Sequence, residues 1–238
     1  MPLQIPSTPG ATGAAPAAGR FGDGPLSRIA AAVYTLLVVQ ALFVLAVAPG
    51  LVLLSLLARD VSNLPLVAVA VAPVGPALSA AIWALHRPLD PTDLHPAAAF
   101  RHGYRLGALP VLRLWLPALA LLSVVGINLT HLDVAGVPRS FAVPLTAIAA
   151  GTVLWAADAL VIATVFDFRT RDAARLAGYF LLRAPGVTVG VALLGAACAA
   201  VVYAASEAAL AGVGALVGLS LLRTCRPMIV RIEREFVR

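Results

Sequence analysis

One acidic residue and one proline-rich turn are the features of this 238-residue chain whose residue types could do chemistry within its apolar runs. Asp158 lies inside the run 141–166, and an acid buried in an apolar span is a proton or cation site unless its neighbours satisfy it. Pro73, Gly75 and Pro76 interrupt a second run, where each proline frees a backbone carbonyl one turn back. Two interpretations stay open for both features: a ligand site, or a satisfied polar group and a packing kink.

A second group of residues combines aromatic and basic side chains at helical spacing within segment 87–109. Its members are Phe100, Arg101, Tyr104 and Arg105. Residues four apart share one face of a helix, and Pro96 is placed to begin a short interfacial helix that runs to Leu109. Arg171 and Arg175 repeat the spacing of the arginines. Lipid contact, docking of a partner and a plain connecting segment are the three interpretations of these residues.

Catalytic, cofactor and metal motifs are absent from the sequence. There is no phosphate-binding loop, nucleophile elbow or zinc-protease helix, and the four histidines lie at spacings that suit no compact metal site. We therefore expect a protein without enzymatic activity, cofactor or metal. The formal charge of +6 does not indicate nucleic acid, because the arginines lie between apolar runs and not on one polar face.

Long aliphatic runs contain Asp158 and the proline-rich turn and flank the aromatic and basic residues. Hydrophobic residues make up 61% of the chain and charged residues 12%, against roughly 45–50% and about 25% in soluble domains. A helix needs about 20 residues to cross a hydrocarbon core of about 30 Å. The sequence therefore predicts an all-α polytopic membrane protein with six transmembrane helices, or five if the short last run does not cross. The runs are 29–58, 64–85, 110–130, 141–166, 186–206 and 208–222.

The distribution of arginine predicts the orientation of the chain. All 17 basic residues are arginine, which together with the abundant alanine indicates a bacterial source. Six spans place every arginine except Arg59 and Arg139 on one side of the membrane. By the positive-inside rule, both termini lie in the cytoplasm of a multi-pass protein of the cytoplasmic (inner) membrane. The predicted domains are a disordered tail (1–26), a transmembrane helical domain (27–225) and a basic cytoplasmic tail (226–238).

An arginine triplet recurs 70 residues along the chain. Its two copies are Arg101, Arg105 and Arg113, and Arg171, Arg175 and Arg183. The recurrence favours parallel repeats of two-helix hairpins, formed by spans three and four and by spans five and six. The alternative is that arginine-rich loops on one side of a membrane resemble one another.

The segment Pro73-Val-Gly-Pro-Ala-Leu-Ser-Ala-Ala-Ile-Trp-Ala-Leu-His-Arg87, with Phe100-Arg-His-Gly-Tyr-Arg105 after it, resembles the YesL-like integral membrane family. The stretch 171–185 is similar to the actinobacterial branch of that family. The chain departs from the family in its His86-Arg87-Pro88 end and its long N-terminal tail.

The resemblance implies a modest function and supplies no catalytic residue. Members are often encoded beside carbohydrate uptake systems, which implies an accessory or interaction protein of an ABC-type carbohydrate importer. The alternative function is a small transporter whose site lies at the membrane midplane, between the proline-broken second helix and Asp158. Membrane lipids and a membrane transport complex are the expected partners, and the sequence leaves the oligomeric state open.

Overall fold

The computed structural model describes residues 25–58, 60–86, 95–166 and 168–236, and within these ranges the chain is helical apart from short connections. Two 3-10 turns, η1 (Val61–Asn63) and η2 (Arg139–Phe141), precede α2 and α5. The predicted all-α fold is confirmed. The α-helices are α1 (Pro25–Leu56), α2 (Leu64–Val71), α3 (Val74–His86), α4 (Pro96–His131), α5 (Ala142–Val165), α6 (Thr170–Arg183), α7 (Pro185–Ala204), α8 (Glu207–Ala211) and α9 (Gly214–Phe236).

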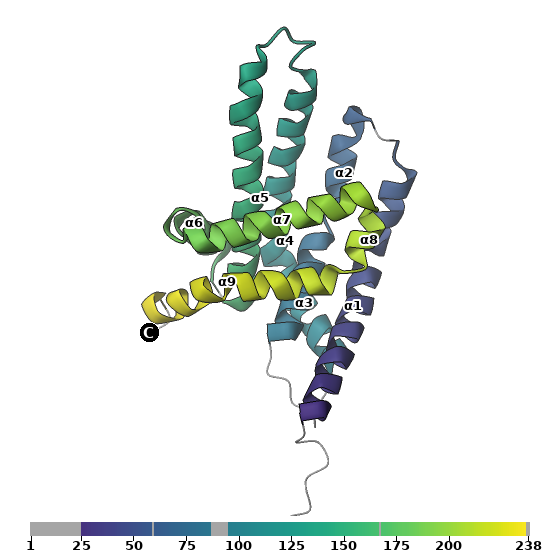
Figure 1. Ribbon diagram of the computed structural model, residues 1–238, viewed down its shortest axis with the longest axis vertical. Helices are drawn as coiled ribbons and strands as arrows, with labels where there is room; N and C mark the ends of the chain where they lie inside the picture. The colour runs from purple at the N-terminus through teal and green to yellow at the C-terminus, as the bar shows by residue number, and fades with distance from the viewer. Residues whose placement is uncertain (1–24, 59, 87–94, 167, 237–238) are drawn as a thin grey trace, which may run out of the picture.

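The helices form two sets that differ in direction (Figure 1). Helices α1, α2–α3, α4 and α5 run along the long axis of the molecule, with the α1–α2 and α4–α5 connections at one end and the start of α1 and the end of α3 at the other. Helices α7 and α9 pack against each other and run across the first set. Helix α9 also contacts α1, α3 and α5, so it ties the two sets together.

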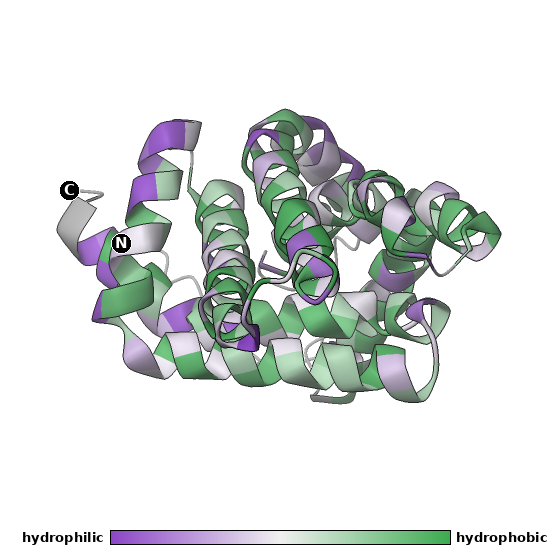
Figure 2. Cartoon of the chain, turned by 90° about the horizontal axis from the view of Figure 1, so that it is seen from above, coloured by the Kyte–Doolittle hydropathy of each residue, from purple (hydrophilic) through white to green (hydrophobic). Residues whose placement is uncertain are grey.

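Within the part of the chain that the structure describes, five helical segments are long and apolar enough to cross a membrane. Apolar residues lie on the outer surfaces of the helices as well as between them (Figure 2); Leu45, for example, is 69% exposed. Such outward apolar surface suits contact with lipid and would aggregate in water. This supports the predicted class of membrane protein. The segments are Leu26–Leu56, Val61–His86, Pro96–His131, Arg139–Val165 and Pro185–Ala204.

The predicted sixth span is not among these five. The apolar run 208–222 divides between α8 and α9, and α9 continues as a helix through the predicted tail to Phe236. Its buried residues recur every three or four positions, so α9 is amphipathic. From the end of its apolar part onward, the buried positions are Leu221, Leu222, Cys225, Met228, Ile229 and Ile232. Six spans and the hairpin repeat are therefore unconfirmed, and Arg113 lies within α4 whereas Arg183 ends α6.

Other boundaries differ from prediction in ways that the chain explains. Pro96 is the first residue of its helix, as predicted, but α4 continues through Pro110 to His131 as one helix. Proline is tolerated inside membrane helices because neighbouring groups satisfy the freed carbonyls. The predicted loop after α5 contains the amphipathic helix α6, which buries Ala173 and Phe180. The predicted tail 1–26 lies almost wholly outside the described residues.

Two clusters of buried side chains hold the bundle together. One joins α5, α6 and α9 through residues such as Leu160, Phe180 and Met228. The other joins α1, α3 and the start of α4, where the small side chains of α3 let α1 and α4 approach closely. Helices α1 and α2 also approach closely at Gly50, because a Cβ at this position would collide with the Ala70 carbonyl oxygen of α2. These contacts position the groups described next.

Candidate functional site

The proline-rich turn breaks the helix between α2 and α3, and Trp115 of α4 packs against this break. Helix α2 ends at Val71 before Pro73, and the indole nitrogen Nε1 of Trp115 donates to the Val71 carbonyl oxygen at 3.3 Å. A Cβ on Gly75 would lie 2.8 Å from Cγ of the same indole, so only glycine lets the ring pack flat against the break. Pro76 is buried as well. The predicted break is present, and its geometry is that of a packed kink.

Asp158 is enclosed beneath α9. Its side chain is 1% exposed, and Cys225 Sγ donates to its carboxylate Oδ1 over 3.9 Å, a long hydrogen bond even for sulfur. Among the described side chains, no arginine forms an ion pair with this carboxylate. The sequence did not identify Cys225 as its neighbour. Among the described residues no hydrogen bond joins Asp158 to the break at Pro73, so these two halves of the predicted midplane site are held by different contacts.

Gln40 connects α1 to the turn between α8 and α9. Its amide nitrogen Nε2 donates to the Ala211 carbonyl oxygen at 2.7 Å, and its Oε1 accepts from the backbone N–H of Ala215 at 2.8 Å. One side chain thus satisfies the last carbonyl of α8 and an early N–H of α9, groups that a helix end leaves free. This residue was missed in the sequence, although it is the one amide in the first apolar run.

The aromatic and basic residues of α4 line a groove against α1. Phe100 is 5% exposed and stacks on Tyr104 with ring centroids 6.4 Å apart. Arg101 and Arg105 are exposed on the same side of α4, and the groove has a volume of about 760 Å³. The structure therefore brings all four predicted residues of this group to one surface, together with an apolar wall from α1. Leu42, Leu45 and Ala46 form that wall.

Arginines also mark the exposed faces of α6 and α9. Arg171 and Arg175 are exposed on α6, while Ala173 between them and Ala177 after them are buried. On α9 the exposed arginines lie opposite the buried residues and line a shallow hollow; no carboxylate forms an ion pair with them among the described side chains. We call this surface the α9 arginine face. It consists of Arg223, Arg226, Arg231 and Arg234.

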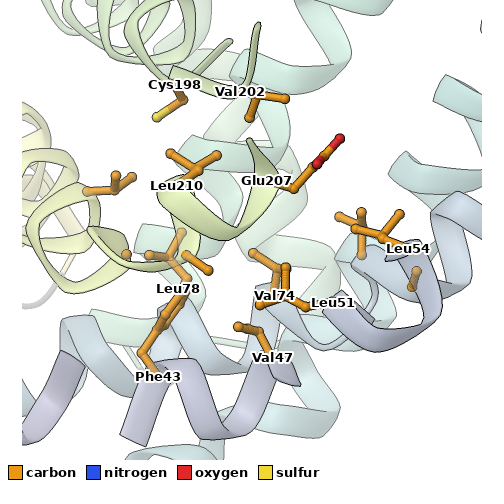
Figure 3. Close-up of a pocket in the computed structure, with 15 residues that line it drawn as sticks. Phe43, Val47, Leu51, Leu54, Val74, Leu78, Cys198, Val202, Glu207 and Leu210 are labelled. Atoms are coloured by element: carbon orange, nitrogen blue, oxygen red, sulfur yellow. The ribbon is translucent and has the colours of Figure 1, made fainter. Parts of the chain in front are cut away.

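A cavity of about 240 Å³ lies between α1, the α2–α3 break and the α7–α9 layer (Figure 3). Its lining is almost entirely apolar and includes Phe43 of α1, Leu78 of α3 and Cys198 of α7. The one carboxylate, Glu207, points away from the apolar side chains. This cavity suits an apolar chain better than a charged solute.

A pair of hydrogen-bonded hydroxyl groups lies between α3, α4 and the end of α5. The Thr164 hydroxyl bonds the Ser79 hydroxyl at 2.8 Å, and both border a cavity of about 310 Å³ that Trp83 also lines. The indole Nε1 of Trp83 is buried without a hydrogen-bond partner. This cavity has hydroxyls and a free donor but no charged side chain among its lining residues.

Within the described ranges, no three His, Cys, Asp or Glu residues lie close enough together to hold a metal ion. Comparison with protein-family models, curated proteins and solved structures finds no match to this chain. The observations that bear on function are therefore the surfaces and buried groups described above.

Proposed function

We propose that the protein is a non-catalytic accessory protein of a bacterial cytoplasmic membrane that docks onto a membrane transport complex through the α9 arginine face. The observation that carries the proposal is the set of four exposed arginines without a carboxylate partner among the described side chains. Clustered cations of this kind favour an acidic partner surface and speed its association. The buried side of α9 packs against α1, α3 and α5, so the arginines are held on a fixed helix.

The identity of the partner rests on the family resemblance. The Pro73–Arg87 and Phe100–Arg105 segments resemble the YesL-like family, which implies an ABC-type carbohydrate importer. We propose such an importer as the complex that this protein accompanies. The orientation is proposed with it: the arginine distribution favours both termini in the cytoplasm, where the α9 arginine face would meet the cytoplasmic parts of an importer.

Copurification from native membranes tests the docking proposal. After crosslinking, the tagged protein should recover transport-complex subunits. Arg226→Gln with Arg231→Gln should strongly reduce that recovery, because the change removes two charges from the α9 arginine face. Arg101→Gln with Arg105→Gln is the matched control, since it removes two charges from α4 and should leave recovery unchanged. Equal recovery with the α9 variant and the wild type would refute docking through this face.

A small transporter is the second candidate function, and the buried carboxylate favours it. Asp158 is 1% exposed and accepts a hydrogen bond from the thiol of Cys225. Carboxylates without a cation inside a membrane bundle often serve ion or proton paths. Purified protein in proteoliposomes distinguishes the two functions. Ion-coupled solute flux that stops with Asp158→Asn supports transport, whereas no flux together with stable partner recovery supports the accessory function.

A further inference from the structure

We propose that the groove between α1 and α4 binds one molecule of an anionic phospholipid, with its phosphate on Arg101 and Arg105 and an acyl chain against α1. This site is independent of the docking proposed for α9. The two walls of the groove differ in chemistry: α4 supplies the cations, and α1 supplies Leu42 and Leu45. An occupant that matches both walls must join an anion to a long apolar chain.

The cationic wall is built to receive an anion. Arg101 and Arg105 are four residues apart on one helix and are both exposed, so their guanidinium groups can reach one phosphate together. Neither forms an ion pair with a carboxylate among the described side chains. The buried Phe100 beneath them stacks on Tyr104 and fixes this face of α4 against the bundle.

The apolar wall extends from the level of the headgroups toward the membrane centre. Tyr34 lines the groove near the start of α1 and is 51% exposed, and tyrosines of this kind lie at the interface between headgroups and hydrocarbon. Leu42 and Leu45 follow it on the same helix, about 12 and about 16 Å further along the axis at about 1.5 Å per residue. Leu45 is 69% exposed. A chain anchored beside Tyr34 would therefore cover Leu45 and the exposed part of Leu42, which is half-buried against the bundle.

Charge is what selects the occupant. A zwitterionic lipid could cover the leucines equally well, but it would bring a cation close to the two arginines. An anionic headgroup gains attraction from each arginine near the surface. Free phosphate would satisfy the arginines but would leave the α1 wall uncovered. The geometry therefore points to an anionic lipid, and not to a soluble anion.

Native mass spectrometry of the full-length protein in detergent tests this site. The probes are dioleoyl phosphatidylglycerol, dioleoyl phosphatidylcholine and inorganic phosphate. We expect one phosphatidylglycerol to be retained in preference to phosphatidylcholine, and millimolar phosphate not to displace it. Arg101→Gln with Arg105→Gln should weaken phosphatidylglycerol binding about 30-fold. Arg171→Gln with Arg175→Gln removes the same charges at the same spacing from α6 and should leave binding unchanged.

A second variant tests the apolar wall without altering charge. Leu45→Trp adds bulk at an exposed position, so it should weaken both lipids while the protein stays folded, as circular dichroism would show. Equal affinity for the two lipids, displacement by inorganic phosphate, or equal losses in the α4 and α6 variants would overturn the proposal. A spectrum in which the α4 variant changes the number of protein copies, and not of lipids, would show that a second copy occupies the groove.

Discussion

Replacing Gln40 with leucine should release α9 from the bundle. Leucine has a similar volume but cannot donate to the Ala211 carbonyl or accept from the Ala215 N–H, so two hydrogen bonds are lost. Hydrogen bonds between membrane helices contribute about 0.6 kcal/mol on average and about 1.7 kcal/mol at most. The free energy of local opening should therefore fall by about 1.2 to about 3.4 kcal/mol, which multiplies the open population by about 8 to about 300.

The thiol of Cys225 reports this opening. It is fully buried between α9 and α5 in the closed state, so a maleimide can alkylate it only when α9 moves. The measurement is the alkylation rate of the detergent-purified protein in a Cys198→Ala background, which removes the second cysteine. Ser123→Ala is the control, because it removes hydrogen bonds on α4 that do not involve α9. An alkylation rate for Gln40→Leu equal to that of the control would refute the anchoring of α9 by this side chain.

Three further predictions concern the break, the carboxylate and the orientation. Gly75→Ala should lower the melting temperature because its Cβ meets the Trp115 ring, whereas Gly195→Ala, which meets open space, should not. Asp158→Asn should leave the fold and partner recovery intact if the carboxylate is structural. Loss of ion-coupled solute flux in a folded variant would instead support an ion path. Reporter fusions after the C-terminus should read as cytoplasmic and those after Gly136 as external, and a periplasmic C-terminus would contradict the proposed orientation.

Long aliphatic runs made the spans predictable. The predicted runs 141–166 and 186–206 agree with α5 and α7 within two residues at each end, because bilayer thickness fixes the length of an apolar helix. The proline break was predictable for a similar reason, since proline removes a backbone donor wherever it lies. The partner of the freed carbonyl was not. That partner is the indole of Trp115 on α4, and nothing in the local sequence of α2 indicates it.

The end of α9 is hard to predict from the sequence because an apolar run continues into an amphipathic helix. The run 208–222 is apolar enough to be predicted as a short span, yet the spacing of Leu222, Cys225, Ile229 and Ile232 shows a single buried face. The contacts of Gln40 could not be predicted from the sequence, because both of its partners are backbone groups far along the chain.

The arginines of α9 also constrain how many helices cross the membrane. If α7 crossed and α9 did not, the α9 arginine face would lie opposite Arg101 and Arg171, against the positive-inside distribution. If both crossed, the apolar part of α9 before Arg223 would be far shorter than the about 20 residues that a span needs, so the first arginines would be drawn toward the hydrocarbon at a cost of up to about 2.5–3.5 kcal/mol each. An amphipathic helix with arginines on its exposed face instead suits a membrane surface. Helix α7 packs along α9 and both run across the other helices (Figure 1), so α7 has the length and composition of a span but not the direction of the other four candidates.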